Sequence, residues 1–408
     1  MPFAEAKKSN SFTAELEKEH VIPLTDLGLA KNKPATSKLP EITAQDKPIF
    51  LDPKHKEEVE KTFKEGVKSF KEDSSLKSET MKKLEALVYI MRDKEDGFGI
   101  NYVRYDSPTK PKTAEEVYQS KEGDCDDLSR LYVALAKQLG ITNLTQFYVV
   151  FKNESTGKEE GHAALFYVDG AVLYIDPAFE KAYIIPTKSK TLNEAIADSQ
   201  FRKDLEKCQF EARGKKDEWK ISEIKAIPGS QSVEAVYCFE MGNYFSGIRD
   251  WDNASKYMQA AVEGGMKTFA AYFTFGEANY RLKRYGDAIE ALEVANKLNN
   301  KDADGYRYLG LAYGKQGRYA DAADTFRKQV ELDSKDYDAK YNLASSCVRV
   351  ADDLMKTKEY KKAFELYSES EKVFLSIRGI DSSDIEEIET TLTYIKDMKE
   401  EAKGKLSK

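Results

Sequence analysis

Residues 121–140 read Lys-Glu-Gly-Asp-Cys-Asp-Asp-Leu-Ser-Arg-Leu-Tyr-Val-Ala-Leu-Ala-Lys-Gln-Leu-Gly. This stretch predicts a helix that begins at Cys125, because Asp124 is a capping residue type and Asp127 supplies a carboxylate three positions later. Gly140 stands where a helix often ends in a left-handed residue. Apolar residues at helical spacing predict one buried face, made by Leu128, Leu131, Tyr132, Leu135, Ala136 and Leu139.

The chain has only three histidines, and His162 is the one that opens an apolar stretch. A second apolar stretch ends at Asp176, whereas His20 and His55 lie in polar, charged sequence. Residues 146–151, 162–168 and 172–175 are rich in β-branched and aromatic side chains and predict strands. A thiol at a helix start, an imidazole entering a strand and a carboxylate leaving the next strand are the parts of a Cys-His-Asp acyl-transfer site.

The turn between the last two strands sets a geometric condition on this site. Asp169-Gly170 is a hairpin signal, and a strict two-residue loop would pair Val168 with Ala171. His162 and Asp176 would then lie on opposite faces of the sheet, because side chains alternate along a strand. The site therefore requires a three-residue loop or a bulge between Val168 and Asp176.

The start of the cysteine helix has opposing electrostatic effects on the thiol. A helix N-terminus and a nearby imidazolium both lower a thiol pKa, whereas Asp126 and Asp127 act against the thiolate. Unpaired N–H groups of the first turn offer a site for an oxyanion, and Tyr102 or Tyr105 could add a second donor by position. The four cysteines form no C-x-x-C pair, so we expect no metal site, cofactor or disulfide framework.

Over residues 75–180 the chain resembles the transglutaminase-like, papain-type cysteine superfamily. The resemblance rests on Thr113-Ala-Glu-Glu-Val, on residues 121–131, on Gly161-His162-Ala163 and on Tyr174-Ile-Asp176-Pro177. It implies an α+β fold with the cysteine helix packed on an antiparallel sheet. It also implies Cys125 as nucleophile, His162 as base and then acid, and Asp176 as the orienting carboxylate. Members of the superfamily attack amide carbonyls through a thioester, and some have lost the triad and serve as scaffolds.

After residue 231 the sequence repeats every 34 residues. The repeat consists of a small residue, an aromatic residue nine positions later, then alanine and a large apolar residue, as in Gly276, Tyr285, Ala288 and Leu292. This register resembles the tetratricopeptide repeat, a helix-turn-helix unit that stacks into an all-α solenoid. In the fourth unit Tyr360, Ala363 and Tyr367 come seven residues late, which predicts two extra helical turns before Tyr360.

These patterns divide the chain into five parts. We expect a disordered arm over 1–50, the transglutaminase-like domain over 51–186 and a connecting segment over 187–230 with one helix near 192–210. The repeats cover 231–376, and a capping helix with a tail covers 377–408.

Composition limits the partners. The 64 basic and 71 acidic residues are interspersed and give a net charge of −7, which argues against a nucleic-acid partner. No apolar run approaches the roughly 18 residues that a membrane span needs, so we expect a cytoplasmic protein without membrane association.

Two functional hypotheses follow. In the first, the chain is a cysteine acyltransferase or hydrolase (a peptidase, deamidase or crosslinker) that acts on protein or peptide amides, and its repeats recruit a protein partner. In the second, the chain is a non-catalytic scaffold whose repeats provide the interaction surface. The residues that recur every 34 positions are packing residues and do not define a ligand.

Overall fold

The computed structural model describes residues 51–70, 78–103, 109–153, 159–178, 180–189, 191–213, 219–225, 233–380 and 385–407. The arm expected over 1–50 lies outside these residues. The described chain forms two compact units, one that ends at Ala271 and one that begins at Tyr272.

Four helices make up the first half of the first unit. They are α1 (Lys56–Ser69), α2 (Glu79–Arg92), α3 (Ala114–Ser120) and α4 (Cys125–Gln138), with a short 3-10 turn at Pro53–His55. Strands β1 (Asn101–Tyr102) and β2 (Glu122–Gly123) form a small parallel pair before α4. Helix α4 begins at Cys125 as predicted, and Gly140 follows it with a φ of +83°.

A five-stranded antiparallel sheet follows. Its strands are β3 (Thr145–Asn153), β4 (Glu159–Val168), β5 (Val172–Asp176), β6 (Lys181–Ile185) and β7 (Trp219–Lys225), in the order β6-β5-β4-β3-β7. The sequence predicts the first three of these strands and misses β6 and β7.

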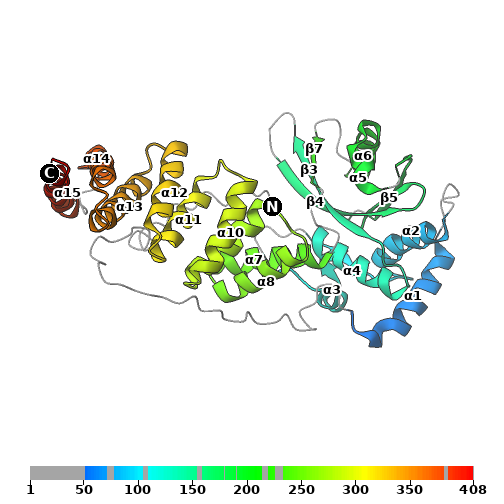
Figure 1. Ribbon diagram of the computed structural model, residues 1–408. Coiled ribbons are helices and arrows are strands. Elements are labelled where there is room, and N and C mark those ends of the chain that lie inside the picture. The colour runs from blue at the N-terminus through cyan, green and yellow to red at the C-terminus, as the bar shows by residue number, and fades with distance from the viewer. Residues whose placement is uncertain are drawn as a thin grey trace. The chain divides into compact units, whose positions relative to one another are not determined.

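The two faces of the sheet pack against different helices (Figure 1). Leu165, Leu173 and Ile175 belong to the core that contains α2 and α4. Phe166 and Tyr174, at the alternate positions, belong to a second core. That second core is completed by α5 (Leu192–Ala197) and α6 (Ser199–Arg213). Period-two alternation of apolar residues thus lets one sheet bury both faces.

The prediction of a single helix near 192–210 is wrong in one respect, because the structure has two helices there. Asp198 ends α5 in an extended conformation. Its Oδ1 then accepts hydrogen bonds from the N–H groups of Gln200, at 2.7 Å, and Phe201, at 3.2 Å. A side chain that caps a new helix interrupts the old one.

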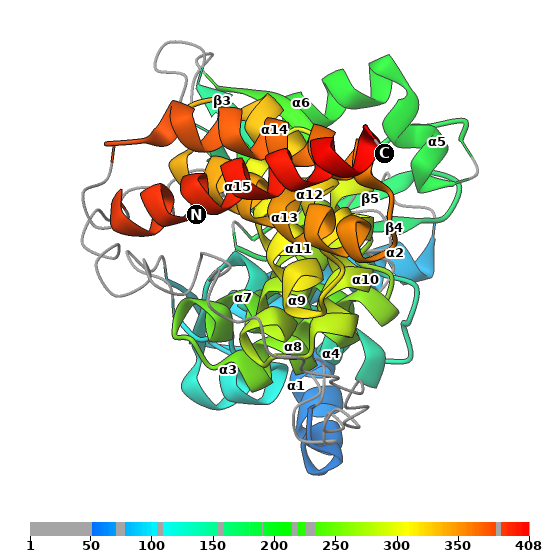
Figure 2. The same ribbon diagram turned by 60° about the vertical axis from the view of Figure 1, so that its left-hand side comes forward.

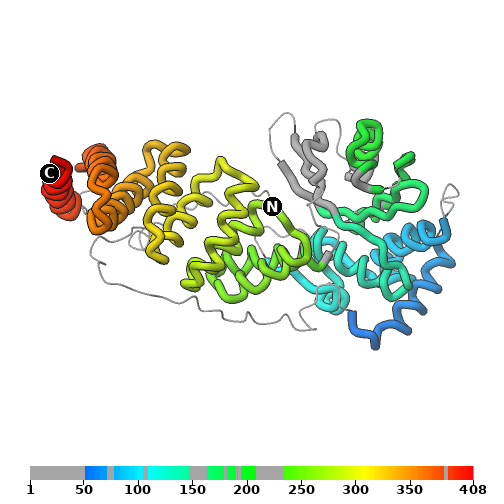
Figure 3. Tube along the Cα trace, viewed as in Figure 1, coloured from blue at the N-terminus to red at the C-terminus, as the bar shows by residue number. Residues whose placement is uncertain are grey.

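The remaining described part of the chain is helical (Figure 2). Helices α7 (Val233–Gly247) and α8 (Trp251–Glu263) belong to the first unit, and α9 (Phe269–Arg281) spans the unit boundary. The second unit continues with α10 (Tyr285–Leu298), α11 (Ala303–Lys315), α12 (Tyr319–Leu332), α13 (Tyr337–Lys356), α14 (Tyr360–Ile377) and α15 (Ile385–Leu406). Each helix from α10 to α14 packs against the next one (Figure 3).

The 34-residue register is explained by contacts within each helix pair. A Cβ atom at Gly242, Gly276 or Gly310 would lie 2.7, 2.5 or 2.7 Å from Met258, Leu292 or Phe326, respectively. The glycine of each of these repeats therefore leaves room for the large apolar side chain of the following helix. Helix α13 has 20 residues and α11 has 13, which confirms the two extra turns.

Candidate active site

Cys125 is the first residue of α4, at the positive end of the helix dipole. Asp124 caps this end, since its Oδ1 accepts hydrogen bonds from the N–H groups of Asp126 and Asp127 at 3.0 Å each. Oδ2 of Asp127 accepts a hydrogen bond from the N–H of Asp124 at 3.3 Å. This reciprocal capping box, predicted from the residue types, fixes the backbone that carries the thiol.

The surroundings of Cys125 keep its thiol protonated. The side chain is partly buried, and its Sγ donates a hydrogen bond to Oδ2 of Asp126 at 3.8 Å. Burial and the charges of Asp126 and Asp124 raise the pKa of the Cys125 thiol well above its ordinary value. A hydrogen bond from the N–H of Ala163 lowers that pKa in part. A base must therefore remove the proton before the sulfur can act as a nucleophile.

The first turn of α4 offers fewer donors to an oxyanion than a bare helix end would. Asp124 already accepts from the N–H groups of Asp126 and Asp127, and its carbonyl accepts from Leu128 at 2.9 Å. Within the described first turn, the N–H of Cys125 is left for an oxyanion. Tyr102 is half-buried and packs against the first core, and Tyr105 lies outside the described residues.

Asp176 is the last residue of β5, and its side chain is fully buried. The phenol of Tyr174 donates a hydrogen bond to Oδ2 of Asp176 at 2.8 Å. The backbone just after Asp176 is also held, because Arg92 donates to the carbonyl oxygens of Pro177, at 3.4 Å, and Ala178, at 3.0 Å. The carboxylate thus occupies a rigid position.

The hairpin between β4 and β5 has the irregularity that the sequence requires. Val168 pairs with Val172, so the loop consists of three residues, 169–171. Phe166 pairs with Tyr174, and the same parity extends to positions 162 and 176. The expectation of a three-residue loop or a bulge is confirmed.

The backbone of His162 lies in β4, opposite Val149 of β3. Its side chain lies outside the described residues, as do His20 and the side chain of Cys208. What the structure brings together is therefore the Cys125 sulfur and the N–H of Ala163, the residue after His162. The charge of Asp176 also raises the pKa of the Cys125 thiol, so this carboxylate lies within electrostatic range of the sulfur.

Three residues around the site were not predicted from the sequence as site residues. Arg92 and Tyr174 act on the segment of Asp176, as described above. Gln146, fully buried at the start of β3, donates from Nε2 to Oδ1 of Asp126 at 3.2 Å. Tyr174 could have been found from strand periodicity, because it lies two positions before Asp176 and hence on the same face.

The cysteines of the helical repeats are packing residues. Cys238 and Cys347 are buried, and burial raises the pKa of each thiol from 9.0 to about 12. Neither forms a disulfide within the described part of the chain.

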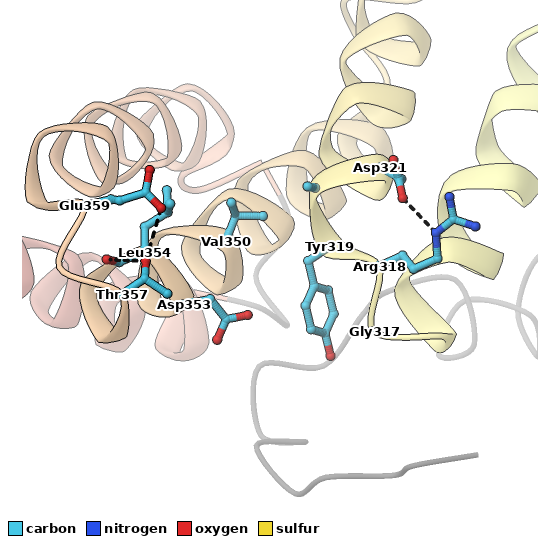
Figure 4. A pocket seen from close by; sticks show the side chains of 10 residues that line it. Gly317, Arg318, Tyr319, Asp321, Val350, Asp353, Leu354, Thr357 and Glu359 are labelled. Atoms are coloured by element: carbon cyan, nitrogen blue, oxygen red, sulfur yellow. Dashed lines mark hydrogen bonds and ion pairs between the residues drawn. The ribbon is translucent and has the colours of Figure 1, made fainter. Parts of the chain in front are cut away.

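A pocket of about 320 Å³ lies in the second unit, between segments 317–321 and 350–359 (Figure 4). Three of its acidic residues are paired with neighbouring cations, namely Asp321 with Arg318 at 2.7 Å, Asp353 with Lys356 at 2.8 Å and Glu359 with Lys362 at 2.6 Å. The lining combines these charges with the apolar side chains of Val350 and Leu354.

Comparison with known proteins agrees with these observations. A family model for the transglutaminase-like superfamily matches residues 71–169, and one for the tetratricopeptide repeat matches 239–303 and 308–371. No curated protein matches the chain significantly. None of the helices in the described ranges combines the length and low polarity needed to cross a bilayer.

Among solved structures, the chain is similar to the Arabidopsis OM64 TPR domain, with 21% identity, a TM-score of 0.26, and coverage of 28% of this chain and 93% of that one. It is also similar to YrrB, described as a TPR protein with an unusual peptide-binding site, with 20% identity, a TM-score of 0.29, and coverage of 34% and 68%. The second TPR domain of human RPAP3, solved with an HSP70 peptide, shows 16% identity, a TM-score of 0.26, and coverage of 28% and 93%.

The capped helix that starts at a cysteine, the antiparallel sheet beside it and the 34-residue helical repeats thus agree with the two matching family models. The chain carries a transglutaminase-like domain followed by tetratricopeptide repeats.

Proposed function

We propose that the chain is a cysteine acyl-transfer enzyme of transglutaminase-like type that acts on protein or peptide amides. Cys125 is the nucleophile, His162 the base and then the acid, and Asp176 the carboxylate that orients the imidazole. The observation that carries the proposal is the position of the Cys125 sulfur. It lies at a capped helix N-terminus, hydrogen-bonded to the N–H of Ala163 and within electrostatic range of Asp176.

The reaction begins with transfer of the Cys125 proton to His162 as the sulfur attacks the amide carbonyl carbon. The tetrahedral oxyanion accepts a hydrogen bond from the N–H of Cys125. The C–N bond then breaks, and the imidazolium returns its proton to the leaving amine. Water or a second amine attacks the thioester carbon and releases the thiol, so that the product is an acid or a new amide.

The raised pKa of the thiol explains why a base is needed in this mechanism. Burial, Asp126 and Asp124 all favour the neutral thiol, so a helix end alone does not supply a thiolate at neutral pH. Formation of an imidazolium beside the sulfur compensates for these carboxylates during the attack.

We infer that the tetratricopeptide repeats bind a protein partner, which is either the substrate or a protein that holds the enzyme in a complex. Stacked helix pairs present long, continuous surfaces, and their packing columns leave the remaining positions available for recognition. The pocket of the second unit, which combines ion-paired and apolar side chains, is one such surface.

The second candidate is a non-catalytic scaffold that uses the repeats alone. One observation favours it, namely that the surroundings of Cys125 stabilise the neutral thiol and not the thiolate. In an enzyme, His162 removes the thiol proton and so overcomes this effect. In a scaffold, the Cys125 thiol stays protonated and its reactivity does not depend on His162. Dependence of thiol reactivity on His162 therefore separates the two candidates.

The test is alkylation of Cys125 by iodoacetamide near neutral pH, followed by peptide mass spectrometry. We expect Cys125 to react and His162→Ala to abolish the reaction. His55→Ala is the matched control, because His55 binds Glu115 through Nε2 at 3.1 Å and takes no part in the site. A Cys125 that reacts equally slowly in the wild type and in His162→Ala would favour the scaffold.

A second measurement determines the reaction type. The protein is incubated with a glutamine-rich protein and a fluorescent primary amine, and the products are analysed by mass spectrometry. Incorporation of the amine indicates a crosslinker, conversion of glutamine to glutamate a deamidase, and chain cleavage a peptidase. Cys125→Ser should give none of these products.

A further inference from the structure

A buried arginine lies on the helix of the nucleophile. Arg130 is five residues after Cys125 in α4, and its side chain is 1% exposed, the largest side chain that is fully buried among the described residues. A guanidinium is always charged, so it has to be balanced inside the protein. The partners of the Arg130 guanidinium therefore indicate which segments it connects.

One side of the Arg130 guanidinium holds the start of its own helix. Nη2 is bonded to Oδ1 of Asp127, and Nε donates to the carbonyl oxygen of Lys112 at 2.8 Å. Oδ1 of Asp127 also accepts from the N–H of Lys112 at 2.9 Å, and Oδ2 accepts from the N–H of Asp124. Asp127 is thus shared between the arginine and the cap that carries Cys125.

The other side of Arg130 is held by the first repeat helix. Nη1 donates to Oε2 of Glu240 in α7 at 2.6 Å, and the guanidinium lies 5.1 Å from the ring centroid of Tyr237, one turn earlier in the same helix. Glu240 is largely buried, with 17% of its side chain exposed. The nucleophile helix and α7 belong to the same unit of the structure.

A chain of charged groups therefore connects the first repeat to the nucleophile. It runs from Glu240 through Arg130 and Asp127 to Asp124, which directly precedes Cys125. Removal of one partner from a buried ion pair leaves the other charge uncompensated, so each group in this chain depends on its neighbour. Loss of the Glu240 charge would pull Arg130 toward Asp127 and away from the arrangement that holds the cap.

We infer that Arg130 and Glu240 are positioning residues for the nucleophile, so that the first helix of the repeats completes the active site of the transglutaminase-like domain. The inference rests on the proposed function of Cys125. It assigns to α7 a part in acyl transfer in addition to any binding of a partner.

The test uses the full chain and compares Glu240→Gln with Glu263→Gln. Gln retains a hydrogen-bond acceptor for Arg130 and removes only the charge. Glu263 is the matched control, because it lies on α8 of the same repeat and is exposed, where it accepts a hydrogen bond from Gln259. Each variant is characterised by its thermal unfolding, by the pH profile of Cys125 alkylation with iodoacetamide, and by kcat and KM for an amide substrate that the incubation with a glutamine-rich protein identifies.

For Glu240→Gln we expect kcat to fall about tenfold or more with KM within about twofold, because misplaced reacting groups lose transition-state geometry and not substrate binding. We expect the midpoint of the alkylation profile to move to lower pH, since Arg130 then offsets the carboxylates around the sulfur. Glu263→Gln should behave like the wild type in both measurements.

A Glu240→Gln variant that unfolds at a lower temperature but retains the wild-type pH profile and kcat would overturn the inference, because Glu240 would then be structural only. If Glu240→Gln does not fold, Glu240→Asp keeps the charge but withdraws it from Arg130, and the same comparison applies. Failure of the proposed function is detected separately, as alkylation of Cys125 that proceeds equally in the wild type and in His162→Ala. The alkylation profile still reports on Glu240 in that case.

Discussion

The phenol of Tyr174 donates a 2.8 Å hydrogen bond to Oδ2 of Asp176, two residues later on the same face of β5. Both side chains are fully buried, so neither can exchange this bond for one with bulk water. The sheet thus supports the predicted orienting carboxylate from within its own strand.

Substitution of Tyr174 by Phe should weaken both the fold and the site. We expect a loss of about 1 to 3 kcal/mol in the free energy of unfolding, because a buried acceptor loses its donor. Acyl transfer should also fall, since Asp176 becomes less ordered. Urea denaturation and the kinetics of the amide reaction measure the two effects. Tyr167→Phe, on the opposite face of the sheet, is the control, and equal effects of both variants would contradict this role.

Substitution of Arg92 by Met should affect activity more than stability. Arg92 donates to the carbonyl oxygens of Pro177 and Ala178 and pairs with Glu180 at 3.4 Å. Without it, the segment that follows Asp176 loses its support, and we expect kcat to fall by about tenfold. Glu180→Gln removes only the more exposed ion pair and should have little effect. A Glu180→Gln variant as impaired as Arg92→Met would show that the ion pair is what matters.

Neutralising Asp126 should make Cys125 more acidic. The Asp126 charge raises the pKa of the Cys125 thiol, so Asp126→Asn lowers that pKa and increases the thiolate fraction at neutral pH. The pH profile of iodoacetamide alkylation should move to lower pH. Glu122→Gln, an exposed change nearby, should leave the profile in place. A profile unchanged in Asp126→Asn would contradict a role for the Asp126 charge and leave burial, Asp124 and Asp176 as the causes of the raised thiol pKa.

Buried thiols should make the repeats sensitive to alkali. Burial raises the pKa of Cys347 from 9.0 to about 12, so the folded state binds the thiol proton more tightly than the unfolded state. The resulting stabilisation is fully present below pH 9.0 and is lost as the pH rises toward about 12. We expect chemical denaturation over this pH range to show that the free energy of unfolding falls less steeply with pH for Cys347→Ala than for the wild type. Parallel plots of the free energy of unfolding against pH would exclude the effect.

The glycine column of the repeats offers a test of packing. Gly310→Ala places a methyl group 2.7 Å from the ring of Phe326, so we expect a loss of about 1 to 3 kcal/mol. Gly286→Ala is the control, since a Cβ there meets only the far end of Gln316 at 3.6 Å. Alanine at that helical position should be neutral or stabilising by up to about 1 kcal/mol. Thermal unfolding of the two variants decides between close packing and a tolerant interface.

Local features of the fold could be read from the sequence because their causes are local. The cap at Asp124, the glycine after α4 and the lengthened α13 each depend on residues within a few turns. The expectation of a three-residue loop or a bulge followed from parity together with the hypothesis that His162 and Asp176 share a face, since side chains alternate along β4 and β5. The break at Asp198 was missed because a capping residue inside a helical pattern gives the same composition as an uninterrupted helix.

Supporting residues of the site could not be found in the same way. Arg92 and its carbonyl partner at Pro177 are 85 residues apart, and Arg130 and Glu240 are 110 residues apart. Neither pair belongs to a spacing that a helix or hairpin imposes. Charged residues are also frequent throughout this chain, so no single one stands out before the fold brings it next to its partner.

The bond between Arg130 and Glu240 also bears on how this protein can be divided. A fragment cut near residue 230 would retain Cys125, His162 and Asp176, the residues proposed to act on an amide, yet the Arg130 guanidinium would lose its carboxylate partner Glu240. Replacement of the helical repeats by those of another protein would also leave Arg130 without a carboxylate partner, unless the new first helix carried an acidic residue at the position of Glu240. The transglutaminase-like domain therefore depends on a residue that lies beyond its own end in the sequence, namely Glu240 of α7.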